Sequence, residues 1–273
     1  MIRKIGVDIT EPAIAQTTDV VYGHLDGFCG TQYIPLRMSI LRRRDDCFIE
    51  DPEKIKLRPV LVFLCGGSWI STDHNAWLPE LYSFVRKGYV VASVEYPVRA
   101  STRFQEQAAS VRKAIDFLRE NADRYHIDPE KMFIGGESAG AYLASYFAAE
   151  NQNGRIGGCI SWYPPTLPER VYSPSLRDLG ITDRVPADMN LPIDTFDYPD
   201  ITKLVTVNSA PNFIIHGDAD DLVSPQNGRD LYDAWEAAGV RADLLLIEGA
   251  GHGDDRCFQP EVMEHITAFL QNL

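Results

Sequence analysis

Short apolar runs alternate with longer amphipathic segments along most of this chain, and this alternation is the feature that most restricts its fold. The apolar runs have the composition of buried strands and cover residues 60–65, 89–94, 132–136, 156–162, 212–216 and 242–247. Apolar residues recur at helical spacing in residues 104–118, 226–238 and 261–270. Strands that alternate with helices predict an α/β protein whose mostly parallel sheet is covered by helices on both faces. Residues 19–23 and 36–41 are predicted to be antiparallel edge strands.

The composition excludes several classes of protein. The 273 residues include 26 Lys and Arg against 39 Asp and Glu, a net charge of −13, so a nucleic-acid partner is not expected. The five cysteines lack the CxxC spacing of a zinc or redox site, and no His, Asp and Glu cluster has metal-ligand spacing. We therefore expect no metal and no cofactor.

The chain also lacks the sequence marks of a membrane or exported protein. No stretch of about 18 apolar residues is present, so we expect no membrane association. The first residues lack the apolar run of a secretion signal. The prediction is a cytoplasmic protein with free thiols, and the sequence leaves its oligomeric state open.

We expect residues 1–273 to form a single α/β domain with one irregular insertion at about 162–209. Prolines are frequent in this insertion, and a long irregular segment inside a compact domain is usually functional, so a cap or lid is predicted. The alternative is an ordered excursion with no role in substrate binding. Its aromatic residues could stack on a sugar or an aromatic acid, or form a small core of the loop itself. They are Trp162, Tyr163, Tyr172, Phe196 and Tyr198.

The sequence Gly-Glu-Ser-Ala-Gly at residues 136–140 matches the G-x-S-x-G pattern. It follows the predicted strand 132–136 and opens an apolar helix, the context in which such a turn lifts a serine hydroxyl above a sheet. The Ala139 N–H at the start of this helix would face an oxygen that becomes negative. Ser138 is the predicted nucleophile, and a purely structural glycine turn is the alternative.

A serine hydroxyl needs a base, and His252 is the best candidate. It lies between two glycines in a loop of small residues after the strand 242–247, so its imidazole can stay accessible. His216 ends a strand and is predicted to hold the loop that follows it. The remaining histidines are predicted to be surface or loop residues, namely His24, His74, His126 and His265.

The base needs an acid that fixes its tautomer and stabilises the imidazolium. Three carboxylates follow the strand 212–216, and we favour Asp220, with Asp218 and Asp221 as alternatives. The chain order of serine, aspartate and histidine is that of α/β-hydrolases. Upstream, Gly66 and Gly67 follow the strand 60–65, where backbone N–H groups could point at a developing oxyanion. A plain glycine turn is the alternative there.

These residues together resemble the α/β-hydrolase superfamily, and most closely the small carboxylesterases whose oxyanion loop reads HGGGW or HGGGF. The resemblance runs from about residue 59 to the C-terminus and includes GESAGAYLA, HGDADDLV and GAGHG. It implies an α/β-hydrolase fold with oxyanion donors at Gly67, Ser68 and Ala139. Two residues depart from the family pattern: Cys65 replaces the usual histidine and Ser68 the third glycine.

The resemblance also implies the activity, a cofactor-independent serine esterase that acts on a small-molecule or carbohydrate ester through an acyl-enzyme. The resembled branch includes acetyl and feruloyl esterases and the arylformamidases, which cleave an N-formyl amide. An arylformamidase-like amide hydrolase is therefore one alternative. A non-catalytic pseudo-hydrolase that only binds a ligand is another, and the altered loop at Cys65 is its support. Cys65 itself is either an oxidation or alkylation sensor or an ordinary buried thiol.

Overall fold

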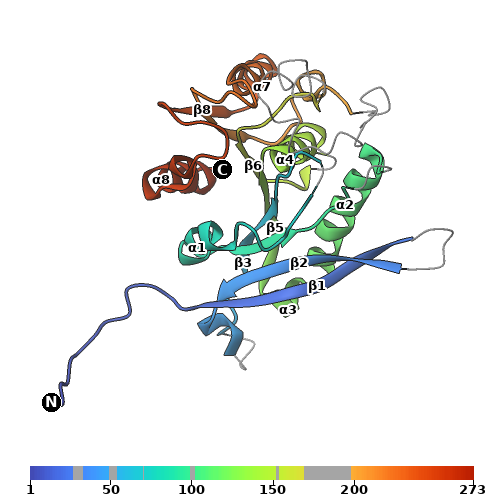
Figure 1. Ribbon diagram of the computed structural model, residues 1–273. Helices are drawn as coiled ribbons and strands as arrows, with labels where there is room; N and C mark the ends of the chain where they lie inside the picture. Colours follow the sequence, from blue (N-terminus) through green and yellow to red (C-terminus); the bar gives the residue numbers. More distant parts are fainter. Residues whose placement is uncertain (27–32, 49–53, 70, 99–101, 152–153, 169–197) are drawn as a thin grey trace.

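One twisted sheet organises the part of the chain that the structure, a computed structural model, describes. That part leaves out residues 27–32, 49–53, 70, 99–101, 152–153 and 169–197. The described residues form an eight-stranded sheet in the order β1-β2-β4-β3-β5-β6-β7-β8 (Figure 1). Its strands are β1 (Ile14–Asp26), β2 (Tyr33–Arg43), β3 (Arg58–Leu64), β4 (Val90–Val94), β5 (Ile127–Glu137), β6 (Gly158–Trp162), β7 (Asn212–Gly217) and β8 (Ala242–Ile247).

The apolar runs of the sequence become the parallel strands β3 to β8, as predicted. Antiparallel pairing is confined to the N-terminal side, where β1 pairs with β2 and β2 pairs with β4. Both N-terminal strands were expected at the edge, but β2 lies inside the sheet, with Ile40 opposite Ala92. Both are also longer than predicted, because added residues such as Gln16 and Thr17 in β1 are exposed and polar and so carry no apolar pattern that the sequence could reveal.

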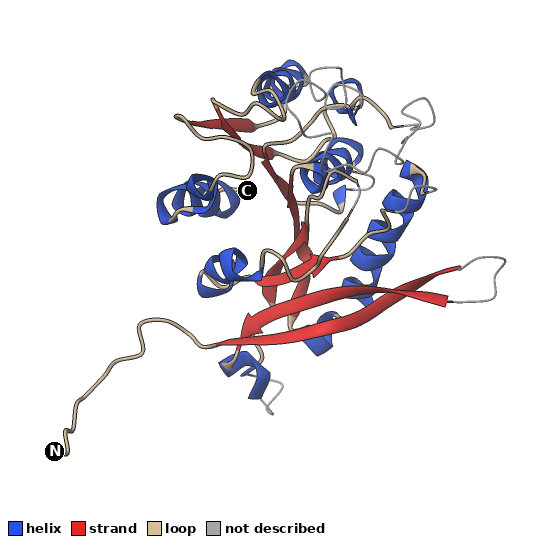
Figure 2. Ribbon diagram, in the orientation of Figure 1, coloured by secondary structure: helices blue, strands red, loops and turns tan. Residues whose placement is uncertain are grey.

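Helices cover both faces of the sheet, and the predicted helical segments are confirmed (Figure 2). The helices are α1 (Leu78–Arg86), α2 (Phe104–Glu120), α3 (Ala122–Tyr125), α4 (Ala139–Glu150), α7 (Gln226–Ala237) and α8 (Pro260–Gln271), with short 3-10 turns η2 (Asp45–Phe48), η7 (Ile201–Lys203) and η8 (Asp255–Phe258). The sequence analysis did not anticipate α1, although Leu78, Leu81 and Val85 give it a buried apolar stripe.

Alternate side chains of each strand enter two separate cores. On β3, Val60, Val62 and Leu64 belong to the core that also contains residues of α2, α4 and α7. Leu61 and Phe63 point the other way and pack with α1 and α8. Because both faces of the central strands are buried, these strands read as continuous apolar runs in the sequence.

The insertion predicted at residues 162–209 is described only at its two ends. Its central part, residues 169–197, lies outside the described residues, as do Tyr172 and Phe196, so the single domain and the lid stay predictions. The aromatic residues that are described belong to the protein core: Trp162 and Tyr163 are 0% exposed and Tyr198 is 8% exposed. For these three, stacking on a bound sugar is excluded in this structure because no ring face is free.

No helix in the described part of the chain combines the length and the apolar character that crossing a bilayer requires.

Phe63 tests the core between the sheet and helices α1 and α8. It is fully buried and meets the Trp162 ring edge-on at 5.9 Å between centroids. Phe63→Ala should lower the free energy of unfolding by about 3–5 kcal/mol, because it removes an aromatic ring from a closed core. Urea unfolding followed by circular dichroism measures this loss. Val207→Ala, at a site 77% exposed, is the control and should change stability by less than about 0.5 kcal/mol.

Burial also predicts which cysteines react. Desolvation raises the pKa of the Cys65, Cys159 and Cys257 thiols to about 12, so all three remain protonated at pH 8. Brief treatment of the folded protein with iodoacetamide should therefore label the half-buried Cys47 well before these three, as read by peptide mass spectrometry. Rapid labelling of Cys65 would contradict this and restore its interpretation as a sensor.

Candidate active site

The candidate catalytic residues follow the carboxyl ends of strands in the parallel part of the sheet. The turn with Ser138 follows β5, the loop with Asp220 follows β7, and the loop with His252 follows β8. The loop that begins at Cys65 follows β3. Because parallel strands place all their carboxyl ends at one edge, segments far apart in the sequence meet there.

Ser138 occupies a strained turn between β5 and α4. Its backbone angles are φ 53° and ψ −121°, a conformation that costs about 1–3 kcal/mol in a non-glycine residue and marks functional turns. The turn is held by the Ser138 N–H, which donates to Trp162 O at 3.0 Å. Gly140 is required in the first turn of α4, because a Cβ there would collide with the backbone of Leu64. The side chain of Ser138 is left partly exposed.

Three side chains that the sequence analysis singled out form one hydrogen-bonded chain. His252 Nε2 lies 2.9 Å from Ser138 Oγ, and His252 Nδ1 lies 2.8 Å from Asp220 Oδ2. Within this hydrogen-bonded series, the His252 side chain is 15% exposed and the Asp220 side chain is 0% exposed, so burial is complete at the carboxylate. The arrangement has the geometry for moving a proton from a serine hydroxyl to an imidazole held by a carboxylate.

Asp220 is surrounded by donors. Its Oδ1 accepts the N–H groups of Leu222 and Val223 at 3.0 and 2.9 Å, and its Oδ2 also lies 3.3 Å from His216 Nε2. Burial by itself would raise the pKa of Asp220, but the bonds from His216 and His252 outweigh it and hold that pKa well below its usual range. Asp220 is therefore ionised at neutral pH and available to stabilise a positive imidazole.

The structure distinguishes Asp220 from the two neighbouring carboxylates that the sequence left open. Asp218 is exposed, and its Oδ1 accepts the Gly249 N–H at 2.6 Å, which braces the loop of the histidine. Asp221 is also exposed, and the residue that contacts His252 is Asp220. His216 holds the same loop, as predicted, because its Nε2 also lies 2.8 Å from Val223 O.

The loop that carries His252 is closed at its base by Arg256. The guanidinium donates to Glu248 O at 3.0 Å and to Gly249 O at 2.8 Å, and it pairs with Asp254 at 2.6 Å. These contacts join the start of the loop to its end. Because Arg256 is exposed, its contribution is to restrict the loop's shape, and its ion pair adds little stability.

The loop after β3 has an unusual backbone. Gly67, Ser68 and Trp69 have φ values of 130°, 54° and 58°, and the last two are not glycines. Such a backbone is not favoured locally, so external contacts must hold it. At Cys65, where the resembled family has histidine, Sγ accepts the Asp73 N–H at 3.2 Å and the carbonyl accepts the Tyr96 hydroxyl at 2.7 Å.

Two residues at the site were missed as site residues by the sequence analysis. Glu137, the variable residue of G-x-S-x-G, is buried and accepts the N–H of Gly66. Tyr163, which was grouped with the insertion, packs edge-on against the His252 ring with centroids 4.7 Å apart. A carboxylate at the junction of an apolar strand and an apolar helix was the available signal for Glu137. No sequence signal places Tyr163, because it follows β6 and meets His252, which follows β8, only after the sheet has formed.

One histidine is more buried than its neighbours in sequence suggest. His74 lies in a turn, as the prediction of a surface or loop residue allows, but it is only 7% exposed. Its Nδ1 lies 3.5 Å from Glu95 and its Nε2 lies 3.6 Å from Asp19. Asp19 reaches it from an irregularity in the β1–β2 pairing, where Asp19 has φ 54°. The polar neighbours of His74 in sequence give no sign of this burial, because Asp19 and Glu95 lie beside it only in the folded protein.

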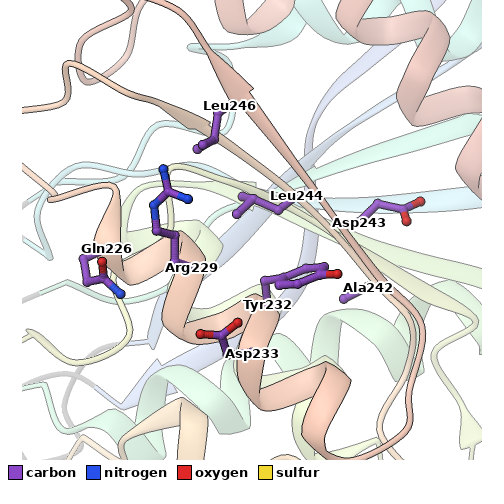
Figure 3. Close-up of a pocket in the computed structure, with 8 residues that line it drawn as sticks. All are labelled: Gln226, Arg229, Tyr232, Asp233, Ala242, Asp243, Leu244 and Leu246. Carbon is purple, nitrogen blue, oxygen red and sulfur yellow. The ribbon is translucent and has the colours of Figure 1, made fainter.

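A hollow of about 620 Å³ lies apart from these residues, between α7 and the outer strand β8 (Figure 3). Arg229, Tyr232 and Asp233 of α7 line one side, and Asp243, Leu244 and Leu246 of β8 line the other (Figure 3). It contains none of the candidate catalytic residues, and β8 is separated from β5 by β6 and β7. It is therefore a feature of the sheet edge and no part of the site.

Comparisons with known proteins agree with this fold. A family model described as BD-FAE matches residues 46–171, a stretch that includes the loop after β3 and Ser138. A solved structure described as a truncated form of a carbohydrate esterase from gut microbiota superposes with a TM-score of 0.73 at 19% identity. That match covers 96% of this chain and 99% of the other chain.

Curated relatives are similar in sequence as well. Esterase LipC of Mycobacterium tuberculosis is 26% identical over 225 residues, which cover 73% of this chain and 54% of the relative. A probable isoprenylcysteine alpha-carbonyl methylesterase of Arabidopsis thaliana, ICMEL2, is 26% identical over 258 residues, 84% of this chain and 60% of the relative. The chain thus spans only about half to three-fifths of the length of these relatives. It has the α/β-hydrolase fold that the motifs predicted, and its sequence similarity is to the carboxylesterase branch of that superfamily.

Proposed function

We propose that this chain is a serine esterase that hydrolyses carboxylic esters without a cofactor. The observation that carries the proposal is the unbroken series of hydrogen bonds from Ser138 Oγ through His252 to Asp220. The similarity to LipC and to the isoprenylcysteine methylesterases supports an ester as the substrate. The three roles are those of a nucleophile, a base and an acid that orients the base.

In the first half of the reaction, Ser138 Oγ attacks the ester carbonyl carbon while His252 Nε2 removes the hydroxyl proton. The positive charge that forms on the imidazole is stabilised by ionised Asp220 through the bond at Nδ1. Collapse of the tetrahedral intermediate breaks the bond to the leaving oxygen, and His252 returns the proton to the departing alcohol. The acyl group remains as an ester of Ser138.

The negative oxygen of the intermediate needs donors, and we assign this role to the N–H groups of Gly67, Ser68 and Ala139. Ala139 begins α4, so its N–H is among the amides that have no partner within the helix. Gly67 and Ser68 belong to the strained loop that contacts the serine turn through Gly66 and Glu137. Loss of one such donor typically costs about 10²–10³ in kcat.

In the second half, a water molecule takes the place of the alcohol. His252 removes a proton from this water as its oxygen attacks the acyl carbon, and the proton then passes to Ser138 Oγ as the acid leaves. The same groups therefore serve both halves, which is why a single histidine held by a single carboxylate suffices.

For the substrate, we infer an acetyl or feruloyl ester of a carbohydrate. The support is the structural likeness to a protein described as a carbohydrate esterase, over almost the full length of both chains. An arylformamidase-like amide substrate and a pseudo-hydrolase without turnover are the competing outcomes, and the experiments below separate them.

Ser138→Ala should abolish hydrolysis of p-nitrophenyl acetate, with a loss of roughly 10⁴–10⁶-fold in kcat, because it removes the hydroxyl that lies 2.9 Å from His252 Nε2. The variant should remain folded by circular dichroism, because alanine keeps the Cβ of serine and leaves the backbone of the turn as it is. A fluorophosphonate probe should label the wild-type protein at Ser138 and leave the variant unlabelled.

Ser145→Ala is the matched control. Ser145 lies on α4, is buried, and bonds to Ser161 at 2.9 Å, away from His252. Its loss should lower stability by about 1 kcal/mol and leave kcat close to that of the wild-type protein. Equal activity of Ser138→Ala and the wild-type protein would refute the proposed nucleophile, and absence of labelling in the wild-type protein would favour the pseudo-hydrolase.

A substrate panel tests the second part of the proposal. We expect kcat/KM to be highest on acetylated xylo-oligosaccharide or methyl ferulate and lower on p-nitrophenyl octanoate and N-formylkynurenine. Measured by release of acid at equal enzyme concentration, turnover that depends on Ser138 but is highest on N-formylkynurenine would identify an amide hydrolase instead.

A further inference from the structure

The residue immediately before the serine carries a buried carboxylate that the mechanism above does not use. Glu137 ends β5 and is 6% exposed, in a strand whose neighbouring residues are apolar or glycine. Burial raises the pKa of its carboxyl, and this effect is opposed by the Gly66 N–H, the charge of His252, the Trp77 indole and the Tyr163 hydroxyl. A buried acid is costly to keep, so positions that retain one are candidates for a functional role.

The partners of Glu137 come from three different segments of the site. Its Oε1 accepts the Gly66 N–H from the loop after β3, and it also accepts the Trp77 indole N–H at 3.1 Å. The hydroxyl of Tyr163 is buried, forms no hydrogen bond of standard geometry with the other described residues, and faces the same carboxylate. The Tyr163 ring in turn rests against His252.

The bond from Gly66 to Glu137 links the loop after β3 to the serine turn, the two segments whose N–H groups are proposed to bind the oxyanion. Gly66 directly precedes Gly67 and Ser68, whose left-handed backbone requires external support. Glu137 directly precedes Ser138 and Ala139 in the sequence. The approach is close, since a Cβ on Gly66 would lie 2.6 Å from Glu137 Oε2. The carboxylate therefore joins the loop to the serine turn by a single side chain.

The second contact extends this link to the base. Trp77 stacks on Phe258 with centroids 4.7 Å apart, and Phe258 follows the loop that carries His252. Tyr163 covers one side of the His252 ring, with an interplanar angle of 63°. Both aromatic residues thus reach the histidine segment while their polar atoms face Glu137.

We propose that Glu137 is a positioning residue that holds the Gly66–Ser68 loop, and through Trp77 and Phe258 the segment that carries His252, in register with Ser138. The inference rests on the proposed function, because the loop and the His252 segment matter only if Ser138 forms a tetrahedral intermediate. Glu137 does not touch the reacting atoms in this assignment. It acts through the direction of the loop N–H groups and the orientation of the imidazole.

The kinetic test compares Glu137→Gln with the wild-type protein on p-nitrophenyl acetate. Gln keeps the size and can keep an acceptor oxygen at the Oε1 position, where the Gly66 N–H and the Trp77 N–H both donate, but it removes the negative charge that strengthens these two bonds. We expect kcat to fall by about 10- to 100-fold with KM changed less than about threefold, because misdirected donors weaken binding of the transition state and not of the substrate. Trp77→Phe removes one donor and keeps the ring, and it should lower kcat by a smaller factor.

Asp46→Asn is the matched control for loss of a buried carboxylate. Asp46 is 5% exposed and pairs with Arg58 at 3.1 Å, at the opposite end of β3 from the loop. It should lower stability and leave kcat unchanged. The positioning role is overturned if Glu137→Gln raises KM and leaves kcat unchanged. It is also overturned if Glu137→Gln, like Asp46→Asn, loses activity only in proportion to the fraction of protein that is unfolded.

A second measurement does not depend on turnover and so separates this inference from the proposed function. In the Ser138→Ala background, Glu137→Gln should increase amide hydrogen exchange in the peptide covering residues 64–72 by at least fivefold, whereas Asp46→Asn should leave that peptide unchanged. A wild-type protein without esterase activity would refute the proposed function, and faster exchange would still support the link to the loop. Unchanged exchange would overturn the link even in an active esterase.

Discussion

The parallel register of β3, β5, β6, β7 and β8 is the constraint on which the candidate site depends. Because these strands run in the same direction, their carboxyl ends lie along one edge, and each is followed by a segment that contributes to the site. His252 and Ser138 are 114 positions apart in sequence, and the pairing of β5, β6, β7 and β8 brings the segments that carry them to the same edge. The helices on both faces matter because they bury the strands and so keep the register.

A second feature of this edge is that several strained residues and buried acids lie close together there. Ser138, Ser68 and Trp69 have positive φ values, and Glu137 and Asp220 are buried acids. Each group is held by contacts from a neighbouring segment, as when the Trp162 carbonyl accepts the Ser138 N–H. Backbone strain and buried charge are retained only where such contacts outweigh their cost. Here they occur at the segments that carry the proposed nucleophile, the acid and the oxyanion donors.

The altered loop after β3 has supporting contacts of its own in place of the family histidine. The resembled family has a histidine at the position of Cys65, which raised the question of whether the loop keeps its geometry. In this structure the Cys65 sulfur and carbonyl both accept hydrogen bonds, and Glu137 takes the Gly66 N–H from the side of the serine. The loop is therefore held from two directions in this structure.

The sequence by itself determined the fold class, the parallel strands and the choice of Ser138, Asp220 and His252 as candidates. Buried parallel strands must be continuously apolar, and a serine turn needs small residues at fixed spacing, so both leave local patterns. The tertiary structure decided what depends on neighbours from distant strands: Asp220 and not Asp218 meets His252, Asp19 and Glu95 lie beside the buried His74, and Tyr163 packs on the imidazole. These contacts leave no local pattern, because a side chain's partner across the sheet is set by strand order, and strand order is absent from the periodicity of any single segment.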